Sequence, residues 1–246
     1  MRCTTMGLIV LAAALLLGGC AAMNTSVMET AETLDRGHVE VGAEYVTGLE
    51  LSTTVFLEDD EETFDADGLA PAECYGLRVG YGVTDRLELN AKLWASIGGV
   101  GWKLYAKYAL TDGTAGATWA VAPGVTRVTT DTDDDDGGSL EEYVASVSTL
   151  GFELPLIVTH RFNESVAVSG TVRYSLDAID IAYPADSALQ DLNDVYMLHR
   201  IGVVNGWTFT MGPLIFQPEI GVEMATQVNG EFGVVPVLAV GLGLEF

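Results

Sequence analysis

The chain has 246 residues and a formal net charge of −24 at pH 7, yet only 19% of its residues are charged and its mean hydropathy is +0.30. A disordered acidic protein would be poor in apolar residues, so this combination excludes that class and indicates an apolar body with acid concentrated in patches. With 11 Lys and Arg against 35 Asp and Glu, the chain also lacks the basic surface that nucleic-acid binding requires.

Residues 1–19 are typical of a cleaved export signal. Met1 and Arg2 give a short basic start, and the apolar run over 7–17 is too short to cross a bilayer, which takes about 20 residues as a helix. A run of this length suits the apolar core of a secretory signal. Removal of the signal leaves enough chain for one barrel or sandwich domain. The chain has three cysteines, and Cys3 would leave with the signal. The two that remain are too few for a disulfide framework.

The end of this segment, Leu17-Gly18-Gly19-Cys20, resembles the lipobox of bacterial lipoproteins, in which the cysteine is lipidated and becomes the first residue of the mature chain. The resemblance implies a covalent lipid on Cys20, and Ala21 in place of Asp implies transfer to the outer membrane. An ordinary secretory signal that happens to precede a cysteine is the alternative. Residues 20–37 are polar and rich in small side chains, so we expect them to form a lipidated tether on the periplasmic side.

From residue 38 onward apolar and polar residues alternate, which is the pattern of β-strands with one polar and one apolar face. Leu87, Leu89 and Leu93, for example, alternate with Glu88 and Lys92. Most such stretches are about 10–14 residues long, near the roughly 9–11 that a tilted membrane strand needs and well above the 5–6 of soluble strands. The expected strands span 38–48, 72–83, 86–97, 100–110, 116–129, 143–159, 164–177, 195–210, 213–227 and 233–246.

These strands predict an all-β fold over residues 38–246. We expect a single antiparallel up-and-down transmembrane β-barrel of about ten strands, with eight or twelve as the alternatives. The connections 49–71, 130–142 and 178–194 are long, rich in acid and free of Lys and Arg. Most of the connections that alternate with them are short, and long outer loops with short periplasmic turns are the pattern of outer-membrane barrels.

The alternation alone does not say which face points inward. Aromatic residues on the apolar face gather at strand ends, with Tyr45 and Tyr75 toward one end and Tyr81, Tyr108 and Phe246 toward the other. The headgroup regions of a bilayer select two such belts, so we predict that the apolar face contacts lipid. A soluble lipocalin-like periplasmic lipoprotein, which would bury that face, is an alternative.

Three segments resemble bacterial outer-membrane β-barrel proteins. Residues 33–37 lead into the first strand as many such domains begin, and residues 81–89 look like their recurrent hairpin. The resemblance covers roughly residues 30–246. It implies insertion into the outer membrane of a Gram-negative bacterium, with lipid, lipopolysaccharide and the barrel-insertion machinery as partners, and it transfers no catalytic residue. The residues similar to the signal that this machinery reads are Val240, Leu242, Leu244 and Phe246.

The polar face carries cations and carboxylates in near balance. Inside a narrow barrel they would have to pair, because an isolated buried charge is very costly. They could be salt bridges that fill the lumen or line a path for a small solute, and ten strands lie nearer to filled eight-stranded barrels than to channels of about 16–18 strands. The predicted lumen charge network comprises Glu40, Glu44, Arg78, Arg86, Glu88, Lys92, Lys103, Lys107, Glu153, Arg173, Arg200, Glu219 and Glu223.

Residues 131–142 are the densest acidic stretch. Asp131, Asp133, Asp135 and Glu142 stand at the first, third, fifth and twelfth places, as in a calcium-binding loop. However, glycine stands at the seventh place rather than the sixth, and strands rather than helices flank the loop. A loosely held divalent cation is one hypothesis and a solvated acidic surface is the other. We expect no further cofactor.

His199 and the nearby Asp194 form the candidate catalytic pair, of the kind that outer-membrane proteases use. The alternation places His199 on the outward face with Met197 and Ile201, so only a bulge would turn it into the lumen. We therefore expect a non-enzymatic barrel, either a narrow solute pore or a structural surface protein with acidic extracellular loops. An outer-membrane hydrolase that acts on peptides or lipid A is the alternative.

Overall fold

The computed structural model describes residues 21–51, 69–96, 99–111, 116–130, 146–182, 194–226 and 232–246. The expected signal with Cys20 lies outside these residues, as do Asp131, Asp133, Asp135 and Glu142 of the acidic stretch. All regular structure in the described part of the chain is β-strand. No helix within it is long and apolar enough to cross a membrane.

Twelve strand segments are present among the described residues. They are β1 (Ala21–Met23), β2 (Val39–Leu51), β3 (Leu69–Thr84), β4 (Leu87–Ser96), β5 (Gly99–Ala109), β6 (Thr118–Val121), β7 (Gly124–Thr129), β8 (Ser146–Asn163), β9 (Val166–Ala182), β10 (Asp194–Met211), β11 (Leu214–Thr226) and β12 (Phe232–Glu245).

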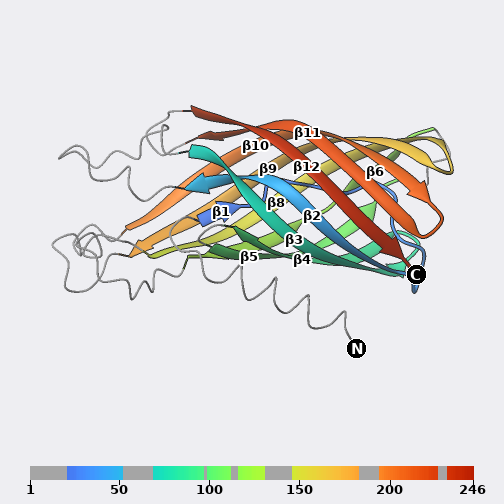
Figure 1. The fold of residues 1–246 in the computed structure, drawn as a ribbon, viewed down its shortest axis with the longest axis horizontal. Helices are drawn as coiled ribbons and strands as arrows, with labels where there is room; N and C mark the ends of the chain where they lie inside the picture. Colours follow the sequence, from blue (N-terminus) through green and yellow to red (C-terminus); the bar gives the residue numbers. More distant parts are fainter. Residues whose placement is uncertain are drawn as a thin grey trace.

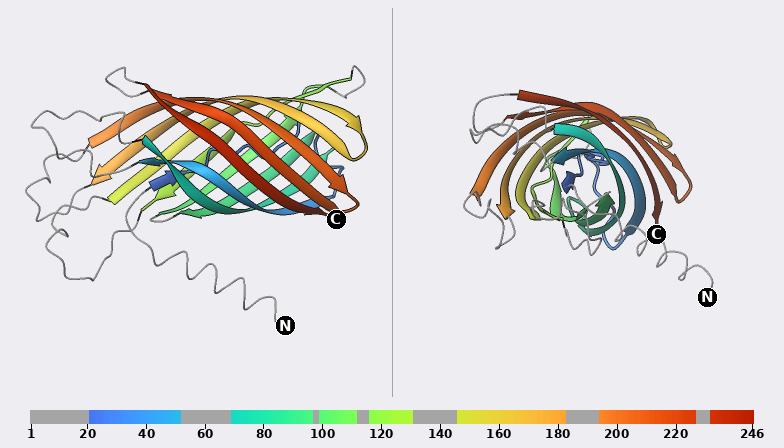
Figure 2. Two further views of the ribbon diagram at one scale, coloured as in Figure 1. Left: turned by 45° about the horizontal axis from the view of Figure 1, so that its top comes forward. Right: turned by 60° about the vertical axis from the view of Figure 1, so that its left-hand side comes forward.

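Strands β2 to β12 form a closed antiparallel barrel (Figure 1 and Figure 2). Each strand pairs with its neighbours in the chain, except that β6 and β7 do not pair with each other, and β12 returns to pair with β2, for example at Val240 and Tyr45. β6 and β7 share one place between β5 and β8, so the described residues make a barrel of ten strands and the predicted fold is confirmed. Ala122 and Pro123 separate β6 from β7, because proline has no N–H to donate to the ladder.

The two ends of the barrel differ. At one end, which we call the turn end, tight connections join β3 to β4, β8 to β9 and β10 to β11. Phe246 lies at this end, where it exchanges two backbone hydrogen bonds of 3.1 and 2.9 Å with Val39. The opposite end, which we call the loop end, is where β2 stops at Leu51 and β3 starts at Leu69 (Figure 1).

The apolar face of the barrel points outward, as the alternation predicts. Leu77, Leu93, Leu150 and Ile220 are each between 57% and 60% exposed on the outer wall. A soluble barrel would bury such side chains, so the lipocalin-like alternative is wrong for this fold. A continuous apolar wall of this kind is what lipid contact requires.

Candidate functional site: a plugged lumen

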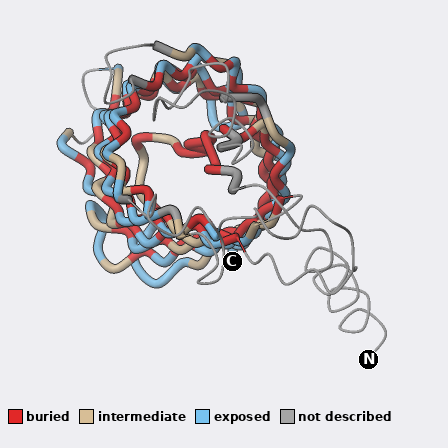
Figure 3. The backbone as a smooth tube through the Cα atoms, turned by 90° about the vertical axis from the view of Figure 1, so that its left-hand side faces the viewer, coloured by how far each residue is buried: buried red, intermediate tan, exposed pale blue. Residues whose placement is uncertain are grey.

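Residues 24–34, which we call the plug segment, lie inside the barrel. Figure 3, seen from the loop end, shows buried chain crossing the ring of strands. Thr25, Met28 and Ala31 are fully buried. The predicted periplasmic tether is therefore wrong for this stretch. Its small polar residues are compatible with solvent, but in the folded barrel their backbone groups find hydrogen-bond partners on the wall.

Wall carboxylates hold the backbone of the plug segment. The amides of Val27 and Met28 donate to Oε2 and Oε1 of Glu219 on β11, at 3.1 and 2.5 Å. The amide of Leu34 donates to Oε2 of Glu88 on β4 at 2.8 Å. A buried N–H without a partner is costly, so these bonds make an irregular segment stable inside the lumen.

Glu29 is the ionic centre of the plug segment. Its carboxylate lies 2.8 Å from Nζ of Lys107 on β5 and accepts a hydrogen bond from the hydroxyl of Tyr105. Arg78 on β3 lies 3.9 Å from the same carboxylate, and its guanidinium also donates to the carbonyl of Met28 and to Glu40. Nζ of Lys107 lies 3.0 Å from Glu88 as well. Charge pairing of this density offsets the cost of burying each ion.

A second anchor ties the segment to β2 and β4. Lys92 lies 3.1 Å from the carboxylate of Glu44 and donates to the carbonyl of Val27 at 3.0 Å. Asn24 donates to the other oxygen of Glu44 at 2.5 Å. The Lys92–Glu44 pair is thus completed by the plug segment on both sides.

The wall cluster is a separate group of six buried charges on β5 and β8 to β11. Arg200 lies 2.7 Å from Asp177 and 2.5 Å from Glu223. Lys103 pairs with Glu153, and Arg173 pairs with Glu223. Three cations thus face three carboxylates, which leaves the cluster neutral. It consists of Lys103, Glu153, Arg173, Asp177, Arg200 and Glu223.

Twelve of the thirteen residues of the predicted network line the barrel interior, with Glu40 the least buried of them. Arg86 does not. It is exposed in the turn between β3 and β4, so its assignment to the lumen is wrong. The physical reason is local: the pairing of β3 and β4 shifts between Gly82 and Thr84, and β4 begins only at Leu87.

Two charged residues of this network, Glu29 and Asp177, are absent from the predicted set. Glu29 precedes the alternating region, so no periodicity marks it. Asp177 is the last residue of the expected strand 164–177 but is absent from the predicted network, yet β9 continues to Ala182 and Asp177 is fully buried. The alternation of Arg173, Ser175 and Asp177 on one face could have placed Asp177 inside.

An apolar layer fills the lumen toward the loop end. Met23 and Met28 pack there against inward side chains from most strands of the barrel. We expected a polar inner face throughout, and this layer departs from that expectation. Its wall residues are Val46, Leu49, Cys74, Trp94, Val128, Val147, Ile179, Leu198, Ala225, Val235 and Ala239.

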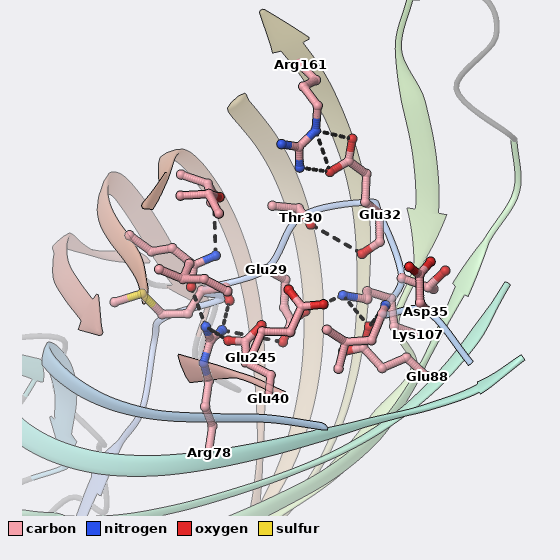
Figure 4. A pocket seen from close by; sticks show the side chains of 17 residues that line it. Glu29, Thr30, Glu32, Asp35, Glu40, Arg78, Glu88, Lys107, Arg161 and Glu245 are labelled. Carbon is pink, nitrogen blue, oxygen red and sulfur yellow. Dashed lines mark hydrogen bonds and ion pairs between the residues drawn. The ribbon is translucent and has the colours of Figure 1, made fainter. Parts of the chain in front are cut away.

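A cavity of about 180 Å³, the vestibule, lies toward the turn end beneath the plug segment (Figure 4). Glu29, Arg78 and Lys107 line it, and Arg78 and Lys107 approach Glu29 from opposite sides. Arg161 of β8 crosses toward Glu32, to which it donates from Nε at 2.8 and 3.0 Å. The vestibule is therefore charged, and the plug segment forms its inner limit.

The histidines lie outside the lumen. His199 is exposed, with Nδ1 2.8 Å from the hydroxyl of Tyr174 on the outward face, as its parity predicts. His38 contacts Glu245 at 3.1 Å at the turn end. Among the described residues no group of three or more His, Cys, Asp or Glu side chains could hold a metal ion.

The outer face of the last strand, β12, is apolar. Val240, Leu242 and Leu244 are exposed on the outer face of β12, and Phe246 is 71% exposed. Their recognition by insertion machinery stays a prediction.

No protein-family model and no curated protein matches the chain. Solved barrel structures resemble it. Neisserial surface protein A is 11% identical and covers 85% of this chain and 96% of its own, with a TM-score of 0.41. Ail of Yersinia pestis is 10% identical and covers 86% of this chain and 99% of its own, with a TM-score of 0.39. OprG of Pseudomonas aeruginosa is 12% identical and covers 89% of this chain and 99% of its own, with a TM-score of 0.41. Likenesses this distant carry no argument about function.

Proposed function

We propose that this protein is an integral outer-membrane β-barrel whose lumen is closed by its own plug segment, and that it acts as a structural surface protein rather than as an open pore or an enzyme. One observation carries the proposal: the plug segment lies inside the barrel, bound to the wall by Glu219, Glu88 and Lys107.

The outer wall supports membrane insertion. Its middle is Leu, Val and Ile, and exposed aromatic rings stand near both ends, with Tyr75 toward the loop end and Tyr81 and Tyr108 toward the turn end. Such a surface is stable only against lipid, so outer-membrane lipid and lipopolysaccharide are the proposed partners. The turn end then faces the periplasm, and the acidic connections face outward.

The closed lumen favours a structural role over conduction. A solute entering the vestibule would meet the plug segment and, beyond it, the apolar layer around Met23 and Met28. Passage would require the plug segment to leave, which would break the contacts of Glu29 and Glu219. A solute path is the second candidate function because the vestibule is lined with charge. The outward position of His199 supports a non-enzymatic role.

We further propose a covalent lipid on Cys20 and a loosely bound divalent cation at Asp131, Asp133, Asp135 and Glu142. The lipobox-like sequence before Cys20 supports the first proposal, and the spacing of the carboxylates supports the second.

Single-channel recording in planar bilayers tests the closed lumen. Refolded native protein should be silent, whereas deletion of residues 21–34 should give discrete openings. Arg161→Ala is the control, because it breaks only the exposed contacts of Arg161 with Glu32 and with the carbonyl of Glu164 and should stay silent. Openings of the native protein equal to those of the deletion variant would favour the solute path. Silence of the deletion variant would mean that wall side chains alone close the lumen.

A further inference from the structure

We infer that the mature chain begins at the loop end of the barrel, so that a lipid on Cys20 enters the outer leaflet of the membrane instead of the periplasmic one. The inference rests on the proposed outer-membrane insertion, and it reverses the side on which the sequence alone places the anchor.

The position of β1 is the first step. β1 pairs with the last residues of β2, with Ala21 opposite Leu51 and Met23 opposite Leu49. Leu51 is the residue at which β2 reaches the loop end. Gly48 permits this approach, since a Cβ there would lie 2.7 Å from the carbonyl oxygen of Met23. The start of the described chain is therefore fixed at the loop end, inside the mouth of the barrel.

The contacts of the plug segment then follow the lumen in chain order. Asn24 binds Glu44 in the middle of β2, and the amide of Ala31 donates to Oγ1 of Thr159 near the turn end of β8 at 2.7 Å. Thr33 donates to the carbonyl of Asp85, in the turn between β3 and β4, at 2.9 Å. The roughly ten residues from Met23 to Thr33 can span at most about 33–36 Å, which matches a hydrocarbon core of about 30 Å.

Covalent geometry ties the lipid to the position of Ala21, which lies at the loop end. Consecutive Cα atoms are about 3.8 Å apart, so a lipid on the preceding residue must start from that end. The turn end is on the order of 30 Å away across the membrane core. A lipid on Cys20 could reach the periplasmic leaflet only if the plug segment left the lumen. That step would strip Glu219 of both amide partners and Lys107 of Glu29. A plugged barrel and a periplasmic anchor therefore exclude each other.

Epitope accessibility on intact cells tests the inference. A short tag inserted between Cys20 and Ala21 is compared with a tag between Gly137 and Gly138, as the loop-end control, and a tag between Asp85 and Arg86, as the turn-end control. We expect antibody to label the first two tags equally on intact cells and the third only after permeabilisation. Labelling of the N-terminal tag only after permeabilisation would overturn the inference. Failure of the Gly137 tag to label intact cells would instead overturn the proposed membrane insertion.

A second measurement covers the case in which the tag displaces β1. In a Cys74→Ala background, Met23→Cys and Leu49→Cys place two thiols opposite each other in register. A disulfide between the two introduced cysteines should form in cells. Mass spectrometry should detect it as a cross-link between their two peptides. The pair Met23→Cys with Asp85→Cys, at the turn end, should not form one. A disulfide in the Met23→Cys, Asp85→Cys variant and none in the Met23→Cys, Leu49→Cys variant would overturn the inference. Mass spectrometry of the N-terminal peptide should find acyl chains on Cys20, and an unmodified cysteine would overturn the lipid part.

Discussion

The carboxylate of Glu29 lies 2.8 Å from the ammonium group of Lys107 although both side chains are shut off from solvent, and the two residues are 78 positions apart in the chain. The plug segment thus adds a carboxylate to cations that also pair with Glu88 and Glu40 of the wall.

Glu29→Ala should therefore destabilise the barrel. It removes the carboxylate that Lys107 and Arg78 share, and because Lys107 keeps Glu88 and Arg78 keeps Glu40, the loss is about 1–3 kcal/mol. Glu32→Ala is the matched control, because it breaks a half-exposed pair with Arg161 worth about 0–1 kcal/mol. Denaturant unfolding in lipid vesicles measures both. Equal losses for the two variants would contradict a structural role of Glu29.

Gly82→Ala should loosen the lower part of the plug segment. A Cβ at Gly82 would collide with the backbone carbonyls of Asp35 and Leu34, where the chain leaves the lumen. Gly170→Ala is the control, since its nearest neighbour, a Val158 methyl group, lies at 3.6 Å. Hydrogen exchange should quicken at the amides of Val27, Met28 and Leu34 in the Gly82 variant alone. Unchanged protection of these amides would show that the segment does not depend on this contact.

Leu77→Arg should destabilise the barrel more than Met211→Arg. Leu77 faces outward in the middle of β3, where an arginine that faces lipid costs roughly 2–4 kcal/mol. Met211 ends β10 at the turn end, where the cost falls to about 0–1 kcal/mol. Unfolding titrations in vesicles compare the two variants. Indistinguishable free energies of unfolding would argue against a membrane around this wall.

Neutralising the acidic stretch should reduce calcium binding without weakening the barrel. In a variant with Asp131, Asp133 and Asp135 changed to Asn and Glu142 to Gln, the repulsion between neighbouring carboxylates falls. Thermal unfolding in calcium-free detergent should therefore be unchanged or shifted upward. Calorimetric titration compares calcium uptake by the two proteins. Equal uptake, or none by either, leaves a solvated acidic surface as the explanation.

The sequence by itself determined the wall of the barrel. Side chains along a strand alternate with a period of two residues, which is a local property. The alternation of Leu87, Leu89 and Leu93 with Glu88 and Lys92 therefore predicted both the strand and its two faces. The prediction failed at Arg86, where the turn interrupts the alternation, and it left out Asp177, the last residue of the expected strand 164–177, although the alternation holds there.

The content of the lumen was decided only by the tertiary structure. Residues 24–34 have no periodicity, and small polar residues suit solvent as well as a polar interior. What fixes them is contact with distant residues, as in the bond from the amide of Met28 to Glu219, 191 positions away. Such a contact exists only after the strands have closed around the segment. The sequence of the segment could therefore predict neither its burial nor the end of the barrel from which it enters the lumen.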